Sequence, residues 1–357
     1  MFKNYTFLIL SLVAFLSIHA QEKTSYESGV EILKKAYELI NQEKIDDAVT
    51  TLQKISPNDS LYSDSFVTIS YYQMAQEKYE DALATIEKGL QLEKSSNARL
   101  GFYINKGLCY VNLESYDLAK KTYLQGLEEF PKNYELLYNL AIIHQRLEEP
   151  QEAFTHLMGT LASSPLYENT MLNLGNMYRK QNKKAQALLL YNLYLLFAPD
   201  EENSFAVLKA ANDMVSGTNL EGEIFPITPD DRLFETQNLI IESELALQKA
   251  YEIPNDINIG FTRQTHALLN QLKEEPFQGS SVLWSEKIIP FFNWIFENDY
   301  FDELSYTTAY AIENEDYKKI ISKKTEDIKA FLPVAYQKWI DIIGDNNVKE
   351  INGKKET

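Results

Sequence analysis

One interval of 34 residues recurs through the middle of this sequence and restricts the fold more than any other feature. Gly107, Ala141 and Gly175 occupy equivalent places in three consecutive segments that are otherwise rich in bulky apolar residues. Two further sets of markers keep the same interval, namely Ala119, Ala153 and Ala187, and Pro131, Pro165 and Pro199. A fixed period in three independent markers indicates a chain of repeated supersecondary units.

Each unit has the pattern of two antiparallel amphipathic helices. A small residue on each helix lets the two backbones approach closely, and Tyr110 or Tyr178, three residues after the small residue, is expected to fill the space beside it. The proline ends the second helix and turns the chain into the next unit. This order of glycine or alanine, tyrosine, alanine and proline at a period of 34 resembles the tetratricopeptide repeat (TPR). The resemblance implies an all-α fold, a TPR-type α-solenoid of stacked helical hairpins.

Two weaker copies precede these segments. Ala48 and Ala82 are again 34 residues apart, whereas the step from Ala82 to Ala119 is 37 and implies three extra residues near 94–99. In the first copy Pro57 comes early, so the second helix of that hairpin is expected to be short. Divergence of this kind is typical of a terminal repeat in a solenoid.

The apolar spacing at 204–217 predicts a helix that caps the far end, so the expected solenoid spans 28–217, with about five helical hairpins plus a capping helix. The period then disappears. A linker is expected at 218–231, a smaller all-α domain at 232–345 and a disordered polar tail at 346–357. In that domain apolar residues recur at helical spacing, and helices are expected at 232–253, 261–275, 282–298, 301–312, 317–331 and 333–343.

Aromatic residues are concentrated in one part of the C-terminal domain. They are Trp284, Phe291, Phe292, Trp294, Phe296, Tyr300 and Phe301. Their spacing places only some of them on one helical face. Two interpretations remain, a helix buried on most of its sides or an aromatic surface that docks a partner or attaches to the solenoid.

The charge of the chain restricts its partners. A net charge of −18 disfavours nucleic acid, whose phosphates require a basic surface, and also an anionic membrane surface. Hydrophobic residues make up 45% of the chain, and glycine and proline are few, so a folded, largely helical protein is expected. Protein or peptide partners therefore fit the composition better than nucleic acid.

The first 20 residues differ from the rest. Lys3 precedes the mostly apolar stretch "YTFLILSLVAFLSI" at 5–18, and a small residue, Ala20, follows. This pattern predicts a cleaved signal peptide at 1–20 and a mature chain that begins at Gln21. A membrane anchor is the competing interpretation, but a spanning helix needs about 17–25 apolar residues. We therefore expect an exported protein, periplasmic or secreted, with no membrane span in the mature chain.

Side chains that could carry catalysis or bind a cofactor are scattered. His144 and His156 have no cysteine or carboxylate in zinc-ligand register, and His144 is expected to be packed or hydrogen-bonded. Cys109, the single cysteine, lies in an apolar helix and is expected to be buried and unreactive. The sequence contains no glycine-rich phosphate loop and no nucleophile elbow. It therefore predicts no enzyme, no cofactor and no metal.

The resemblance implies a binding surface, because the first helix of each hairpin lines a concave groove in such solenoids. Asn105, Asn139 and Asn173 form a ladder at the 34-residue step, and a carboxamide can pair with the backbone of an extended peptide whatever its side chains. Asparagine is also favoured at this place in the repeat, so the ladder alone does not separate binding from consensus. The predicted peptide-binding residues are Asn105, Asn112, Asn139, Gln145, Arg146, Asn173, Asn176, Arg179 and Lys180.

Two functional hypotheses follow. Arg146, Arg179 and Lys180 make one end of the groove basic, which would attract an acidic segment or a C-terminal carboxylate. The first hypothesis is a non-enzymatic, exported adaptor or scaffold that binds a peptide or protein segment in the groove. The alternative is a cell-envelope enzyme with its catalytic site in the C-terminal helical module and the repeats as a targeting arm. A polar cluster with shifted pKa values in that module would favour the alternative.

Overall fold

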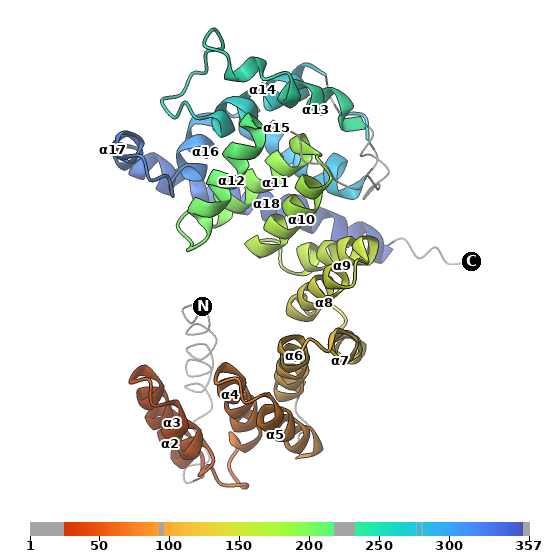
Figure 1. Ribbon diagram of the computed structural model, residues 1–357, viewed down its shortest axis with the longest axis vertical. Coiled ribbons are helices and arrows are strands. Elements are labelled where there is room, and N and C mark those ends of the chain that lie inside the picture. Colours follow the sequence, from red (N-terminus) through yellow and green to blue (C-terminus); the bar gives the residue numbers. More distant parts are fainter. Residues whose placement is uncertain (1–24, 93–95, 218–232, 276, 280, 353–357) are drawn as a thin grey trace, which may run out of the picture. The chain divides into compact units, whose positions relative to one another are not determined.

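The computed structural model describes residues 25–92, 96–217, 233–275, 277–279 and 281–352. All regular elements in these ranges are helical, which confirms the predicted fold class, a TPR-type solenoid followed by further helices (Figure 1). The chain divides into two compact units, Met1–Pro131 and Lys132–Thr357.

Within its described residues, the first unit contains three helical hairpins. They are α2 (Ser25–Asn41) with α3 (Ile45–Leu52), α4 (Tyr62–Ala75) with α5 (Tyr79–Leu92), and α6 (Ser96–Asn112) with α7 (Tyr116–Glu129). The second helix of the first hairpin is short, as Pro57 predicts. The marker alanines Ala48, Ala82 and Ala119 are completely buried on the second helices, so the small side chains do lie where the helices meet.

The residue that faces each small position is not the one that the sequence predicts. A Cβ atom at Gly107 would lie 2.2 Å from the ring of Tyr123, and one at Gly175 would lie 2.9 Å from the ring of Tyr191. Both rings belong to the second helix of the same hairpin and are almost completely buried. Tyr110 and Tyr178 therefore do not fill that space, because a ring that crosses from the partner helix already occupies it.

The turn inside every hairpin has the same backbone geometry. At each of these turns one non-glycine residue has a left-handed φ angle between 54° and 61°, and these residues are Glu43, Glu77, Glu114, Glu148 and Asn182. The amide after each one donates to a carbonyl five residues earlier, as Ser115 N does to Tyr110 O at 2.8 Å. This is the Schellman pattern that ends a helix, and glycine is its usual left-handed residue. The turns repeat at the same 34- and 37-residue steps as the alanines.

The second unit begins with two more hairpins, α8 (Tyr134–Arg146) with α9 (Pro150–Ser163) and α10 (Glu168–Lys180) with α11 (Lys184–Phe197), and continues with α12 (Ser204–Ser216). Every residue of α11 from Lys184 to Leu196 is buried. A helix at the end of an open solenoid would keep one face in water, so α11 must be enclosed by later parts of the chain. Helix α12 is accordingly not the terminal cap that was predicted, because it packs on α14 as well as on α11.

The helices that follow α12 differ in their ends from those expected. They are α13 (Glu235–Glu242), the short 3₁₀ helix η3 (Leu245–Leu247), α14 (Gly260–Glu274), the π-helix η4 (Val282–Ile288), α15 (Ile289–Glu297), α16 (Phe301–Thr308), α17 (Glu315–Lys323) and α18 (Thr325–Asn352). The helix predicted at 232–253 ends early, because Glu244 takes a left-handed conformation. Helix α18 continues through Pro333 and into the tail that was predicted to be disordered.

The aromatic cluster joins these helices to the repeats. Trp284 is fully buried and its ring meets Tyr178 of α10 edge to face, with 5.2 Å between the ring centroids. Trp339 of α18 is also fully buried, and its Nε1 donates to Pro165 O at 2.7 Å. Both predicted interpretations are thus partly right, since the cluster is mostly buried and attaches to the solenoid.

This packing changes the predicted domain division. One continuous core runs from Ala141 to Ile343 and includes both hairpins of the second unit. The repeats at 132–217 and the helices at 233–345 therefore fold around shared side chains, and the boundary between compact units lies at Pro131 instead. The predicted linker at 218–231 and the predicted signal peptide at 1–20 lie outside the described residues.

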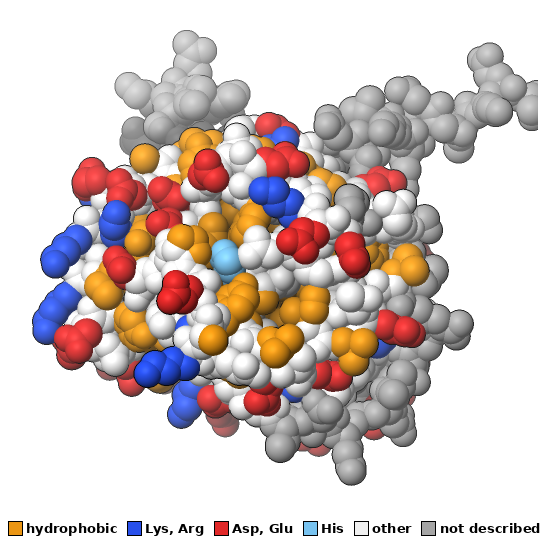
Figure 2. Space-filling model, turned by 90° about the horizontal axis from the view of Figure 1, so that it is seen from above, with side chains coloured by type: hydrophobic (Ala, Val, Ile, Leu, Met, Phe, Trp, Pro, Cys, Tyr) orange, Lys and Arg blue, Asp and Glu red, His pale blue; other side chains and the backbone are white. Residues whose placement is uncertain are grey.

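One end of the second unit has an apolar surface. Seen from the side of α13 and α14, apolar side chains gather in the middle of the face and charged side chains surround them (Figure 2). Leu239 of α13 and Leu245 of η3 are more than half exposed.

None of the helices in the described ranges combines the length and the apolar composition that crossing a bilayer requires.

Candidate peptide-binding face

The predicted binding residues all lie on first helices, but the structure divides them between the two units. Asn105 and Asn112 belong to α6 in the first unit. The others belong to α8 and α10 in the second unit, and they are Asn139, Gln145, Arg146, Asn173, Asn176, Arg179 and Lys180. The ladder is therefore divided between the two units, and the candidate site is the face of α8 and α10.

Asn105 has a structural role in its own unit. Its side chain is 6% exposed, and its Nδ2 donates to Val67 O and to Ser70 Oγ, both at 2.9 Å. These bonds join α6 to α4 of the preceding hairpin. Asn112 is exposed near the end of α6, and its Nδ2 donates to Leu108 O of the same helix at 2.8 Å. Asn105 is thus a bridge between hairpins.

The amides on α8 and α10 have three different environments. Asn173 Nδ2 donates to the hydroxyl of Tyr138 at 2.8 Å, which links α10 to α8. Asn176 Oδ1 accepts a hydrogen bond from the hydroxyl of Tyr191 at 2.8 Å. Asn139 is half-buried, and its side chain makes no hydrogen bond to any other described residue. Asn139 is therefore the member of the predicted ladder whose amide is open to a partner.

Basic and amide side chains gather at the C-terminal ends of the two helices. Arg146 and Lys180 are exposed, and neither forms an ion pair with another residue in the described ranges. Gln145 and Arg179 each bury a side-chain nitrogen, Nε2 and Nε respectively, that has no hydrogen-bond acceptor among those residues. Helix C-termini attract cations, so this end presents the positive charge of the exposed Arg146 and Lys180.

The N-terminal ends of the same helices carry tyrosines and carboxylates that the repeat pattern did not indicate. The ring of Tyr167 lies 5.2 Å from that of Tyr134 and 5.0 Å from that of Tyr138, edge to face in both pairs. Burial raises the pKa of the adjacent carboxyls of Glu135 and Glu168. The two Tyr-Glu pairs at 134–135 and 167–168 are 33 residues apart, so the 34-residue register does not align them.

Cys109 and His144, two side chains with potential reactivity, are both buried and packed. Cys109 is fully buried, and desolvation raises the pKa of its thiol to about 11, which confirms the expected unreactive thiol. His144 is 4% exposed, its Nδ1 lies 2.5 Å from Glu149 Oε2, and its ring stacks on His156. The expected packed, hydrogen-bonded histidine is thus confirmed.

His266 is the histidine of the C-terminal helices, where the alternative hypothesis places catalysis. Its Nδ1 lies 2.7 Å from the hydroxyl of Tyr251, and its ring contacts Phe296 and Phe301. Burial lowers the pKa of the imidazole. These neighbours are mainly aromatic, and they pack α14 against α15 and α16.

Comparison with known proteins agrees with the repeat geometry. Residues 100–133, which include Gly107, Ala119 and Pro131, match the family model described as Tetratricopeptide repeat. The chain therefore carries tetratricopeptide repeats, and proteins with this repeat generally mediate protein–protein interactions.

Two curated relatives have only partial similarity. The "BBSome complex member BBS4 homolog" of Drosophila melanogaster is 24% identical over 66% of this chain and 48% of its own length. The "Transcription factor tau 131 kDa subunit" of Saccharomyces cerevisiae is 27% identical over 44% of this chain and 14% of its own length. The chain thus spans less than half of either relative. A solved tetratricopeptide repeat protein from Parabacteroides merdae aligns with 83% of this chain and 97% of its own, at 13% identity and a TM-score of 0.43.

Proposed function

We propose that this chain is a non-enzymatic, exported scaffold that binds a segment of another protein along the concave face of its repeats. The observation that carries the proposal is the pair of exposed, unpaired cations Arg146 and Lys180 at the same end of α8 and α10. In a chain of net charge −18, with 52 acidic and 34 basic residues, carboxylates outnumber the cations that they could pair with. Two cations without such partners on a repeat's first helices favour an anionic ligand.

The charges on this face also give the bound segment a direction. Glu135 and Glu168 lie at the opposite ends of the helices from Arg146 and Lys180. An acidic segment would be repelled by these half-buried carboxylates and attracted by the cations, so its acidic part belongs at the cationic end. Asn139 lies between the two ends and would pair with the backbone of the segment. Tyrosines at the other end supply the aromatic contacts that are common at interfaces.

The test compares binding by charge-reversal variants. Partners are captured on the wild-type mature chain from a cell-envelope extract, identified, and then titrated against purified proteins at two salt concentrations. The double variant Arg146→Glu/Lys180→Glu should bind on the order of tenfold more weakly at low salt, and its affinity should respond less to salt, because exposed charge pairs are modest in energy and screened by ions. Asn139→Ala should weaken binding by about 0.5–1.5 kcal/mol without changing the salt response.

A matched control is Lys209→Glu, which reverses an exposed charge on α12 of the same unit. It should bind like the wild type. Arg179 is less suitable for charge reversal, because it is half-buried beside Tyr191 and its replacement would disturb the hairpin. If the double variant and the wild type bind the same partner with equal affinity and equal salt response, this face is not the binding surface.

Export is tested by the N-terminus of the protein as the cell makes it. The apolar run at 5–18 and the small residue Ala20 motivate this part of the proposal. Intact-mass measurement of the chain purified from its native cells should give a protein that begins at Gln21. A cytoplasmic protein that retains Met1 would contradict export, and would leave the binding face to be judged by its own experiment.

A further inference from the structure

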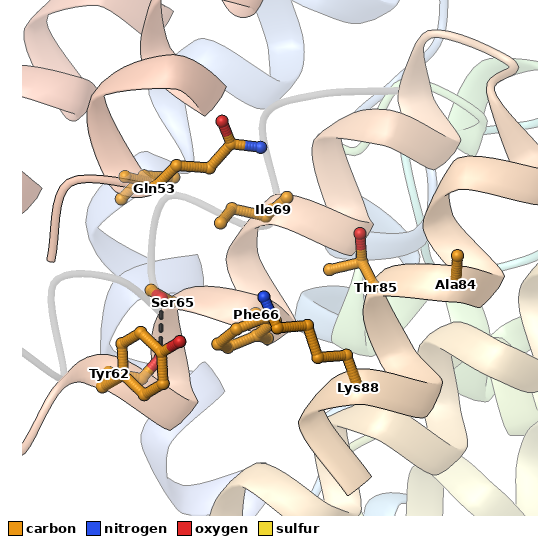
Figure 3. Close-up of a pocket in the computed structure, with 9 residues that line it drawn as sticks. Gln53, Tyr62, Ser65, Phe66, Ile69, Ala84, Thr85 and Lys88 are labelled. Carbon is orange, nitrogen blue, oxygen red and sulfur yellow. Dashed lines mark hydrogen bonds between the residues drawn. The ribbon is translucent and has the colours of Figure 1, made fainter. Parts of the chain in front are cut away.

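The first unit contains a hollow that is separate from the face proposed above. It has a volume of about 370 Å³ and lies among α3, α4 and α5. Figure 3 shows the side chains that line it. They are Leu52, Gln53, Tyr62, Ser65, Phe66, Ile69, Ala84, Thr85 and Lys88. This volume is at the lower end of the range for small-ligand sites and is large enough to accept one aromatic side chain.

The floor of the hollow is apolar. Leu52, Phe66 and Ile69 are buried there, and Tyr62 meets Phe66 edge to face with 5.1 Å between ring centroids. The hydroxyls of Ser65 and Thr85 at its wall are already engaged. Ser65 Oγ donates to Tyr62 O at 2.6 Å, as Figure 3 shows, and Thr85 Oγ1 donates to Gln73 Oε1 at 2.7 Å. A ligand that enters the hollow therefore meets carbon surface with few free polar groups.

Lys88 gives the rim a positive charge. Its Nζ lies 5.2 Å from the centroid of the Phe66 ring, a cation–π contact, and the side chain is exposed. Lys88 forms no ion pair with another described residue. Three cations of the same unit do have carboxylate partners, namely Lys78 with Asp46, Arg99 with Glu129 and Lys106 with Glu87. A cation held over an apolar hollow in an acidic chain is complementary to a carboxylate next to an apolar group.

We propose that this hollow is a docking site for a partner segment in which an aromatic side chain is flanked by a carboxylate. The aromatic side chain enters between α3 and α5 and packs on Phe66 and Ile69, and the carboxylate pairs with Lys88. Burial of one aromatic side chain contributes most of the free energy of binding, and the charge pair orients the segment. The chain then has two docking sites for protein segments, one in each compact unit.

The experiment uses the full-length chain and a defined probe. The probe is a fluorescein-labelled peptide with the sequence Gly-Ser-Glu-Phe-Glu-Ser-Gly. Its binding is measured by fluorescence anisotropy while the concentration of the protein is raised to about 1 mM, which corresponds to the weak end of specific association. The variant Ala84→Leu adds a side chain to an exposed lining position and should abolish binding by filling the hollow. Lys88→Gln should weaken binding by about threefold to tenfold and reduce its salt dependence. Lys121→Gln removes an exposed charge from α7 of the same unit and should have no effect.

Two altered peptides separate the contributions. Replacing the phenylalanine by alanine should abolish binding, and replacing both glutamates by glutamine should reproduce the effect of Lys88→Gln. Thermal unfolding by circular dichroism should show that every variant folds like the wild type, since Ala84 and Lys88 are exposed. The proposal is overturned if the peptide does not bind, or if it binds Ala84→Leu as well as the wild type. None of these results depends on Arg146 or Lys180, so the two sites are tested independently.

Discussion

Replacement of Trp339 by alanine is expected to lower the free energy of unfolding of the second unit by about 3–5 kcal/mol, the usual cost of truncating a buried tryptophan. The indole is completely buried, and its ring centroid lies 5.3 Å from that of Phe291 and 5.7 Å from that of Phe197. The substitution leaves a cavity between α18, α15 and the end of α11. It also leaves the carbonyl of Pro165 without the donor that it has at 2.7 Å.

Chemical denaturation followed by tryptophan fluorescence and circular dichroism measures this effect. Trp339→Phe is the matched variant, because it keeps an aromatic ring and loses the Nε1 donor, so it should cost less than the alanine variant. Hydrogen exchange shows which helices respond. Because the core is continuous from Ala141 to Ile343, protection should fall in α10 and α11 as well as in α18. A loss confined to α17 and α18 would contradict the shared core.

The second large effect is expected from Gly175→Leu, which should destabilise the second unit by about 1–3 kcal/mol or more through overpacking. A Cβ atom at this position would lie 2.9 Å from Cε1 of Tyr191 and 3.1 Å from its Cδ1. The tyrosine ring is 1% exposed and its hydroxyl is bonded to Asn176, so it cannot move aside. Helices α10 and α11 must therefore separate. Thermal unfolding monitored by circular dichroism measures this loss of stability.

Two further variants show whether the contact is responsible. A Cβ atom at Gly344 would meet no heavy atom within 4 Å, and Gly344→Ala should be neutral or stabilising, since alanine favours a helix by about 1 kcal/mol. The hairpin α8–α9 has Ala141 and Leu157 at the places of Gly175 and Tyr191. The double variant Gly175→Ala/Tyr191→Leu should therefore recover much of the stability that Gly175→Ala loses. If Gly175→Leu unfolds like the wild type, the helices do not meet at this residue.

Local sequence patterns were enough to predict the repeats. Each hairpin is specified by contacts between residues less than 20 positions apart, such as Gly107 with Tyr123, so a short period records them. The C-terminal arrangement depends on contacts such as Trp339 with Pro165, which are 174 positions apart. No periodic pattern carries that information. Helix ends were also missed where the usual signals are absent, because Glu244 is left-handed without being glycine and Pro333 lies inside a helix.

The sequence indicated which helices carry the candidate binding residues, but not the surroundings of each side chain. The register places Asn105, Asn139 and Asn173 on equivalent turns of first helices. Their hydrogen bonds, however, depend on residues of the preceding hairpin. Asn105 donates to the hydroxyl of Ser70, and Asn173 donates to the hydroxyl of Tyr138. Identical residues at identical repeat positions thus differ in whether their amides are open to a partner. The tyrosines of the same face were not predicted because their spacing is 33 residues.

The enclosure of α11 also bears on how such an array can change in length. Solenoids gain and lose hairpins by duplication, because each new unit stacks on an existing one through a standard surface. In the second unit that surface is occupied, since α12, α13, α14 and α16 all pack on α11. A hairpin inserted after α11 would displace the helices that complete its core. Duplication and loss of repeats are therefore expected before α8, whereas the two hairpins that follow share one core with the C-terminal helices and should change in number only together with them.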